Sequence, residues 1–239
     1  RSLAGAELVA VCDVDPTQLA AATQNFEVAG YSDFVTLYET ERPDVVHICT
    51  PHSQHVPAAV AALERGINVI CEKPLSNRVD QGEILLKAAA DSTARIGICF
   101  QNRYNGTVAA LKQRISSGAL GPVKGASGTV MWNRDAAYYE SRPWRGTWEG
   151  SGGGLLINQA IHTLDLLQWI MGDVVQVSGN ASTRVLKGVI DFEDTSELVL
   201  RHADGTRSLF YASNNNGANE PITLSIECEK ASLHLRGDL

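Results

Sequence analysis

The chain has 239 residues, of which 44% are hydrophobic, and its formal charge at pH 7 is −7. This length suits one large domain or two modest ones. No basic cluster opposes the acidic surplus, which argues against nucleic acid and anionic membrane surfaces as partners. No apolar run approaches the roughly 18–20 residues of a membrane span, and no signal peptide is recognisable. We therefore expect a soluble, cytoplasmic protein.

The first half of the chain alternates apolar strand patterns with helix patterns. The predicted strands are 7–12, 44–49, 68–71 and 95–100, and the predicted helices are 16–29, 54–66, 77–91 and 107–117. Pro16 suits the first turn of its helix, where a backbone N–H would be unpaired in any case. Continuous apolar strands separated by helices predict a parallel sheet covered on both faces.

The pattern changes at Gly121-Pro122. One long apolar helix is predicted at 155–171, and the predicted strands are 123–132, 174–183, 196–202, 207–213, 222–228 and 232–235. Asp204-Gly205 is a hairpin signal between two of them. Strands without intervening helices predict an antiparallel sheet. The fold class is therefore α/β followed by α+β, with domains at 1–121 and 122–239.

The five cysteines form no C-x-x-C pair, and each lies in or beside a short apolar run. An odd count at these spacings suits neither a disulfide framework nor a metal site. Cysteines in such runs usually behave as small hydrophobic residues. We therefore predict reduced, buried thiols without a metal or a catalytic role at Cys12, Cys49, Cys71, Cys99 and Cys228.

Asp13 and Asp15 follow the first predicted strand. An acidic residue at such a strand end can accept hydrogen bonds from the adenosine ribose of a bound dinucleotide, and it repels a 2′-phosphate. NAD is then favoured over NADP. The alternative is an aspartate that caps the following helix, and Asp15 is the better cap candidate because it directly precedes Pro16.

Two further strand ends carry polar residues. Thr50, Pro51, His52 and His55 lie where one strand ends and a helix begins, the edge at which open α/β sheets bind ligands. Exposed histidines at a helix start are an equally simple explanation.

Glu72, Lys73 and Pro74 end the next strand. A lysine emerging at this edge can donate to an alcohol or carbonyl oxygen and stabilise its developing charge. A Glu–Lys surface pair would give the same three letters, so the motif leaves both interpretations open.

The helix predicted at 155–171 carries a narrow polar stripe. With Asn158 set at zero, His162 falls at about 40°, Asp165 at about −20° and Trp169 at about 20°. The remaining positions are dominated by Leu, Ile and Met. A lone histidine on a buried helix is usually a satisfied core residue. A histidine stacked between an amide and a carboxylate favours a functional site.

These residues together resemble the Gfo/Idh/MocA family, named for glucose–fructose oxidoreductase, inositol dehydrogenase and a rhizopine catabolism protein. The likeness covers essentially all 239 residues, and its motifs are VAVCDVDP, ICTPHSQHVPAAVAALERGINVICEKPL, FQNRYN and WRGTWEGSGGGLLINQAIHTLDLLQWIMG. The resemblance implies a Rossmann domain followed by an open-faced antiparallel sheet. It also implies NAD-dependent hydride transfer to or from a secondary alcohol of a sugar or cyclitol.

The resemblance also assigns residues to roles. It implies that Lys73 is the active-site lysine, that His162 is the general acid/base, and that Asn158 orients the substrate. Thr50, Pro51, His52 and His55 match the segment beside the cofactor, and Glu72 and Pro74 flank the lysine near the nicotinamide. The implied substrate-side residues are Asn102, Arg103, Tyr104, Trp144, Arg145, Trp148, Asn158 and Asp165. Many members of the family carry Asp at the position of Asn158. The asparagine therefore narrows the subgroup of the family to which this chain is similar.

A larger departure is that no G-x-G-x-x-G precedes Glu7, although the family begins with a strand, a glycine loop and a helix. The chain opens on what should be the second strand and stops where more sheet is usual, so we expect truncation at both ends. The missing loop would supply the amides that bind pyrophosphate.

The absence of this glycine loop favours a non-catalytic dinucleotide-binding sensor as the alternative function. Reduction of a C=C or imine bond is a third possibility. The family's open sheet implies a homodimer or homotetramer.

Overall fold

The computed structural model describes residues 4–237, and the chain divides into two compact units, Arg1–Cys99 and Phe100–Leu239. We call them the N-terminal unit and the C-terminal unit. Residues 106–116 belong to the second unit because Val108, Leu111 and Ile115 pack into its core. The predicted domain boundary at 121 stays a prediction, and the observed division between compact units falls earlier.

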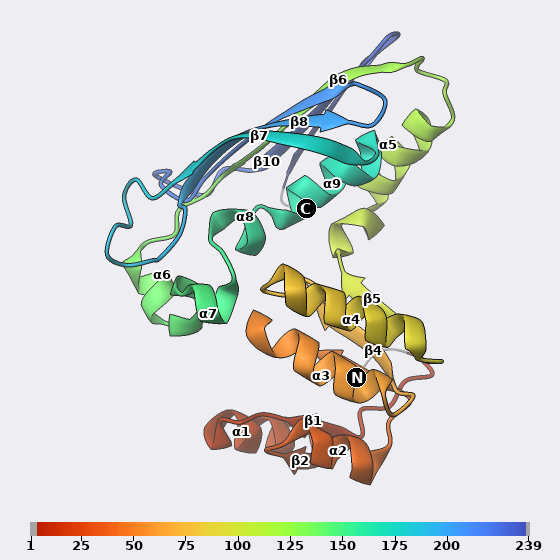
Figure 1. Ribbon diagram of the computed structural model, residues 1–239, viewed down its shortest axis with the longest axis vertical. Helices are drawn as coiled ribbons and strands as arrows, with labels where there is room; N and C mark the ends of the chain where they lie inside the picture. The colour runs from red at the N-terminus through yellow and green to blue at the C-terminus, as the bar shows by residue number, and fades with distance from the viewer. Residues whose placement is uncertain (1–3, 238–239) are drawn as a thin grey trace. The chain divides into compact units, whose positions relative to one another are not determined.

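The N-terminal unit contains two parallel sheets (Figure 1). The strands are β1 (Ala10–Cys12), β2 (Ala29–Tyr31), β3 (Val45–Ile48), β4 (Asn68–Glu72) and β5 (Ile96–Cys99). One sheet pairs β1 with β2, and the other has the order β3-β4-β5. The predicted parallel strands are confirmed. The expectation of one parallel sheet covered on both faces is wrong for the described residues, because no hydrogen-bonded ladder joins β1 to β3 and the His47 and Cys49 side chains are exposed.

Helices follow the strands, and all of them except the second were predicted from the sequence. They are α1 (Pro16–Phe26), α2 (Phe34–Glu41), α3 (His55–Leu63) and α4 (Val79–Asp91), with a 3₁₀ turn η1 (His52–Gln54) before α3. Side chains alternate across each strand. Ile48, Val69 and Cys71 therefore point to one face of the β3-β4-β5 sheet and form a core with Ala59 and Leu63 of α3. Apolar burial on that face holds the helices against the sheet.

The C-terminal unit is built on a six-stranded sheet within residues 123–237. The strands are β6 (Val123–Met131), β7 (Val174–Ser182), β8 (Thr195–His202), β9 (Arg207–Ser213), β10 (Ile222–Cys228) and β11 (Ser232–Gly237), in the order β11-β10-β6-β9-β8-β7. β8 and β9 form the hairpin predicted at Asp204-Gly205. β6 pairs with β9 in parallel, so the predicted antiparallel sheet is mixed although mostly antiparallel.

Helices of this unit lie before β6 and between β6 and β7 in the chain, and the longest of them cover one face of the sheet (Figure 1). They are α5 (Gly106–Ser116), α6 (Ala136–Glu140), α7 (Trp148–Ser151), α8 (Leu155–Asn158) and α9 (Ile161–Met171), with 3₁₀ turns η2 (Gln101–Tyr104) and η3 (Pro143–Gly146). Gly128 of β6 allows α9 to lie close. A Cβ there would meet Leu167, Phe210 and Thr163 at 3.2–3.3 Å. Leu166 and Leu167 are fully buried in the resulting core.

All five cysteines are free thiols. Cys71 and Cys228 are buried, and burial raises the pKa of Cys71 to about 12, which keeps it protonated. Cys12 and Cys49 are exposed, so the prediction of burial is wrong for these two. Their strand faces lack a cover among residues 4–237. Within the same residues, no helix is long and apolar enough to cross a bilayer.

Candidate active site

The carboxyl ends of β3 and β4 bring two of the predicted cofactor segments together. The strands are parallel neighbours, and Ile48 lies opposite Cys71 in their register. Thr50 follows β3 and Lys73 follows β4, so both emerge at the same edge of the sheet. Ligands of open α/β sheets bind at this edge. The sequence motifs around Thr50 and Lys73 therefore meet in the fold, although 23 positions separate them in the chain.

His55 ties these two strand ends to each other. It is fully buried at the start of α3, with Nδ1 2.7 Å from the Pro74 carbonyl and Nε2 3.0 Å from the Thr50 carbonyl. A neutral imidazole has one N–H and satisfies one of these acceptors, whereas the cation donates to both. His52 is also buried, and its ring lies 5.6 Å from that of His55. The alternative of exposed histidines is wrong, because the helix start is packed inside.

Replacing His55 with alanine should therefore destabilise the N-terminal unit. The buried Pro74 carbonyl and the partly buried Thr50 carbonyl lose the imidazole as a hydrogen-bond partner, and a cavity remains, which we expect to cost about 2–4 kcal/mol. Urea denaturation of the variant and of the wild-type protein measures the difference. His47→Ala is the matched control, because His47 is 53% exposed and should contribute far less. An equal loss in the two variants would contradict the bridging role of His55.

Asp15 takes the capping role that the sequence suggests for it. Asp15 is the N-cap of α1, and its Oδ1 accepts from the amides of Thr17 at 2.8 Å and Gln18 at 3.4 Å. This capping prediction is confirmed. Asp13 follows β1, and its Oδ1 accepts from the Asp15 amide at 2.9 Å. That bond holds the Asp13 carboxylate at the strand end, where a ribose contact stays a prediction.

Glu72 and Lys73 are partly buried at the end of β4, and the Lys73–Pro74 peptide bond is cis. The Glu72 carboxylate lies 3.6 Å from Nε2 of His47 on β3. The side chain of Glu72 is 41% exposed, so this contact is open to solvent. Their assignment to the nicotinamide region stays a prediction.

In the C-terminal unit, His162 lies in the first turn of α9 and is partly buried. Phe100 supports it. The two rings meet edge to face, with centroids 6.1 Å apart and planes at 78°. The guanidinium of Arg103 lies over the Phe100 ring, 5.6 Å from the ring centroid. Aromatic and cation–π contacts of this kind restrict where a ring can turn. Sequence reasoning missed Phe100, because an aromatic residue at a strand end resembles ordinary core.

Arg103 and Asp165 form a bidentate ion pair. Arg103 Nε donates to Asp165 Oδ2 at 2.8 Å, and its NH2 group donates to Oδ1. The Asp165 side chain is only 10% exposed, so the pair is well shielded. Arg103 also lies 5.5 Å from the ring of Trp169. Two predicted substrate residues, Arg103 and Asp165, therefore bind each other.

Lys112 lies beside this pair. It donates to the Trp169 carbonyl at 2.6 Å, and burial together with nearby Arg103 lowers the pKa of Lys112.

The helix predicted at 155–171 is broken. α8 ends at Asn158 and α9 begins at Ile161, with a wide turn in which the Ala160 amide donates to the Leu155 carbonyl. The prediction of one continuous helix is wrong, and with it the angles assigned to Asn158 and His162. Asn158 and Gln159 interrupt the apolar run at this point, but two polar residues by themselves do not indicate a turn. Burial of the helix is confirmed, since Leu155 is fully buried.

A buried polar network lies at the break, and sequence reasoning missed it. Gln159 Nε2 donates to the Tyr138 hydroxyl at 3.2 Å. Asn214 Nδ2 donates to Gln159 Oε1 at 3.3 Å and to the Tyr139 hydroxyl at 3.0 Å. Burial raises the pKa of Tyr139 to about 12, so it stays protonated. The polar pair Asn158-Gln159 within an otherwise apolar run is the one signal that the sequence offers for this network.

The remaining predicted substrate residues have varied surroundings. Asn102 is buried in η2, whereas Tyr104 is 89% exposed. The Arg145 guanidinium lies over the rings of Tyr138 at 4.8 Å and Trp144 at 5.6 Å. Trp148 donates from Nε1 to the Asp191 carbonyl at 2.9 Å and packs on Phe192. Trp144, Arg145 and Trp148 thus form part of an aromatic-rich loop region, and their substrate contacts stay predictions.

Two family models match the chain. Residues 1–100 match an oxidoreductase family with an NAD-binding Rossmann fold, and residues 108–234 match the GFO/IDH/MocA C-terminal domain. The chain belongs to the GFO/IDH/MocA family. The predicted resemblance and the two-part fold class are therefore confirmed.

Several solved and curated GFO/IDH/MocA relatives are similar over most of this chain. The WlbA dehydrogenase from Bordetella pertussis, solved with NADH and UDP-GlcNAcA, has a TM-score of 0.92 at 30% identity and covers 97% of this chain and 66% of its own. Levoglucosan dehydrogenase of Pseudarthrobacter phenanthrenivorans is 26% identical over 93% of this chain and 63% of its own length. Inositol 2-dehydrogenase 4 of Saccharopolyspora erythraea is 27% identical over 100% and 68%. This chain therefore spans roughly two thirds of the length of these relatives.

Proposed function

We propose that this chain carries the cofactor and substrate residues of a dehydrogenase that transfers a hydride between NAD(H) and a secondary alcohol of a sugar or cyclitol. The observation that supports this proposal most directly is the position of Lys73. It follows the carboxyl end of β4, beside the end of β3, in a family with an NAD-binding Rossmann fold. A structure of levoglucosan dehydrogenase holds both NADH and levoglucosan. Oxidoreductase relatives favour this function over the non-catalytic sensor.

The chain's own residues fit the cofactor's needs. Bound NAD(H) supplies or accepts the hydride. Asp13 would accept from the adenosine ribose, and the loop held by His55, which contains Thr50, Pro51 and His52, would line the nicotinamide side with Glu72, Lys73 and Pro74. The fit rests on the parallel strand ends, where the backbone of Thr50 and Pro74 is fixed by the buried His55.

The substrate chemistry is a proton transfer coupled to charge stabilisation. His162 takes the hydroxyl proton during oxidation and returns it during reduction. Lys73 donates to the reacting oxygen and stabilises its negative charge. Asn158 orients the substrate through a neighbouring hydroxyl. The ion pair of Arg103 with Asp165 keeps Phe100 and α9 in place around the imidazole.

Titration of the intact protein with NADH and NADPH, followed by nicotinamide fluorescence, tests the cofactor assignment. We expect NADH to bind at least about tenfold more tightly, because the Asp13 carboxylate repels a 2′-phosphate. Asp13→Asn should bring the affinities for NADH and NADPH closer together. Asp91→Asn is the control, because Asp91 lies at the end of α4, which leads to the opposite edge of the sheet. A preference for NADPH, or an unchanged ratio in Asp13→Asn, would refute the assignment.

Product analysis then tests the reaction class. Turnover of NAD with sugars or cyclitols should give a ketone at one hydroxyl-bearing carbon. Binding of NADH without oxidation of any polyol would favour the sensor instead. Reduction of a C=C or imine substrate would identify the third possibility.

We also propose that the protein forms a homodimer or homotetramer through the six-stranded sheet, by the face that points away from α5 and α9. Leu209 is 58% and Tyr211 39% exposed on β9, and Val199 of β8 lies opposite Leu209 on the same face. An exposed apolar patch on a sheet favours association. Light scattering should give a multiple of the chain mass, and Leu209→Lys should lower it. Val79→Lys, at a site 82% exposed on α4, should not. A wild-type mass of one chain would contradict this proposal.

We propose a cytoplasmic location as well. Five free cysteines suit a reducing compartment, in which thiols persist.

A further inference from the structure

One face of the β3-β4-β5 sheet carries a polar cluster that the proposed function does not use as a unit. α3 and α4 pack on the opposite face. Because side chains alternate along a strand, His47 and the following Cys49 project away from that core, as does Ile70 of β4. His47 is 53% and Ile70 45% exposed, and Cys49 is exposed as well.

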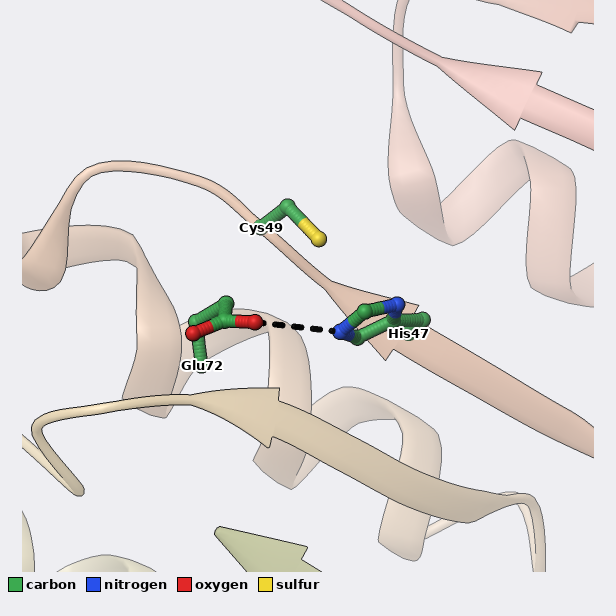
Figure 2. Close-up of side chains that lie close together, drawn as sticks. All are labelled: His47, Cys49 and Glu72. Atoms are coloured by element: carbon green, nitrogen blue, oxygen red, sulfur yellow. Dashed lines mark ion pairs between the residues drawn. The ribbon is translucent and has the colours of Figure 1, made fainter. Parts of the chain in front are cut away.

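His47, Cys49 and Glu72 converge on this face. Figure 2 shows the three side chains gathered above the ends of β3 and β4. One potential ligand atom from each lies within 4.8 Å of the other two, and the imidazole nitrogen of His47 is 3.6 Å from the Glu72 carboxylate. The convergence follows from the register, since Cys49 and Glu72 come directly after the paired residues Ile48 and Cys71.

The donor set is specific in its chemistry. An imidazole nitrogen, a thiolate sulfur and a carboxylate oxygen are the three ligand types that proteins offer to Zn²⁺, at about 2.0–2.3 Å from the ion. A nitrogen and an oxygen ligand of a tetrahedral ion at these distances are about 3.3–3.5 Å apart. The His47–Glu72 separation of 3.6 Å is close to this range. Mg²⁺ and Ca²⁺ prefer oxygen ligands and gain little from Cys49 or His47.

Cys99 supports the carboxylate from the next strand. It lies opposite Glu72 in the β4–β5 register, so the two side chains are neighbours on the same face of the sheet. Partners of this kind orient a metal ligand without touching the ion. Three adjacent strands therefore contribute to one arrangement.

We propose that His47, Cys49 and Glu72 bind a Zn²⁺-class ion, with the fourth coordination position open to solvent. The cysteine spacing in the sequence argues against a metal, because no two cysteines form a close pair. The fold joins one cysteine to a histidine two residues earlier and to a glutamate on the neighbouring strand. This proposal does not depend on the dehydrogenase function.

Cobalt titration of the intact protein tests the site, because Co²⁺ takes the same ligands and is coloured. Wild-type protein should bind one Co²⁺ and develop visible ligand-field bands with a sulfur-to-cobalt charge-transfer band in the near ultraviolet. Cys49→Ser should lose the charge-transfer band, and His47→Gln should bind more than about tenfold more weakly. Cys99→Ala should weaken binding about tenfold and keep the charge-transfer band, as expected of a positioning residue.

Cys12→Ser and His234→Gln are the matched controls. Cys12 is an exposed cysteine on the other sheet, and His234 is an exposed histidine of β11. Both variants should retain the wild-type spectrum and affinity. The absence of a charge-transfer band in the wild-type protein, or its persistence in Cys49→Ser, would overturn the proposal.

Thiol alkylation gives a second readout that does not depend on cobalt. Zn²⁺ should slow the reaction of iodoacetamide at Cys49, measured by mass spectrometry of peptides, and should leave Cys12 unprotected. Equal protection of both cysteines would indicate nonspecific zinc binding to thiols and would count against the site.

Discussion

Replacing Lys73 with methionine is expected to lower kcat for polyol oxidation by about 100- to 1000-fold. The lysine follows β4 at the edge where the strand ends of the parallel sheet meet, and its ammonium group would stabilise the charge on the reacting oxygen. Methionine retains the length of the side chain and removes the charge. Stopped-flow absorbance of NADH measures the hydride transfer, and fluorescence titration shows whether NADH still binds.

Lys87→Met is the matched control for this variant. Lys87 is an exposed lysine of α4 in the same unit, so the same chemical change should leave kcat within about twofold of wild type because surface substitutions rarely matter. Hydride transfer by Lys73→Met near the wild-type rate would remove Lys73 from the mechanism. It would leave the NAD assignment of Asp13 untouched.

Replacing His162 with asparagine is expected to lower kcat by about 10²- to 10⁴-fold. The imidazole lies in the first turn of α9 against Phe100, and we assign it the hydroxyl proton. In the wild-type protein, oxidation should slow as the pH falls, because a protonated imidazole accepts no further proton. The asparagine side chain does not titrate in this range, so the variant should lose this acidic limb of the pH profile.

The pH profile distinguishes a base from a merely structural histidine. His234→Asn serves as the control, because His234 is exposed on β11 and should change neither the rate nor the profile. If the His162 variant keeps the acidic limb of the wild-type protein, another group takes the proton. Thermal unfolding of the variant checks that the contact of His162 with Phe100 is not required for folding.

Much of the secondary structure could be predicted because its signals are local. Asp15 before Pro16 indicates a helix start, and the structure places the N-cap there. Asp204-Gly205 indicates a hairpin, and β8 and β9 form it. The pattern missed β2 and α2, because a strand of three residues is too short to show alternation and the following helix spans only eight. Local signals thus predict elements of ordinary length.

The sequence predicts which residues lie at the candidate site, but it does not predict which atoms these residues contact. Lys73 and Thr50 could be placed at strand ends, since apolar runs precede both. The bridge from His55 to the carbonyls of Thr50 and Pro74 could not, because it joins backbone atoms of two strands. The pairing of Arg103 with Asp165 spans 62 positions and likewise leaves no trace in either local segment.

The sequence by itself determined the family, the order of the longer strands and helices along the chain, and the residue types available for catalysis. These follow from local hydrophobic periodicity, from capping residues and from motifs that can be read in order along the chain. Only the tertiary structure decided the break between Asn158 and His162, the mixed sheet, and the meeting of His47, Cys49 and Glu72. Strand register and buried hydrogen bonds between distant residues set these features, and such interactions depend on the packing of the whole unit.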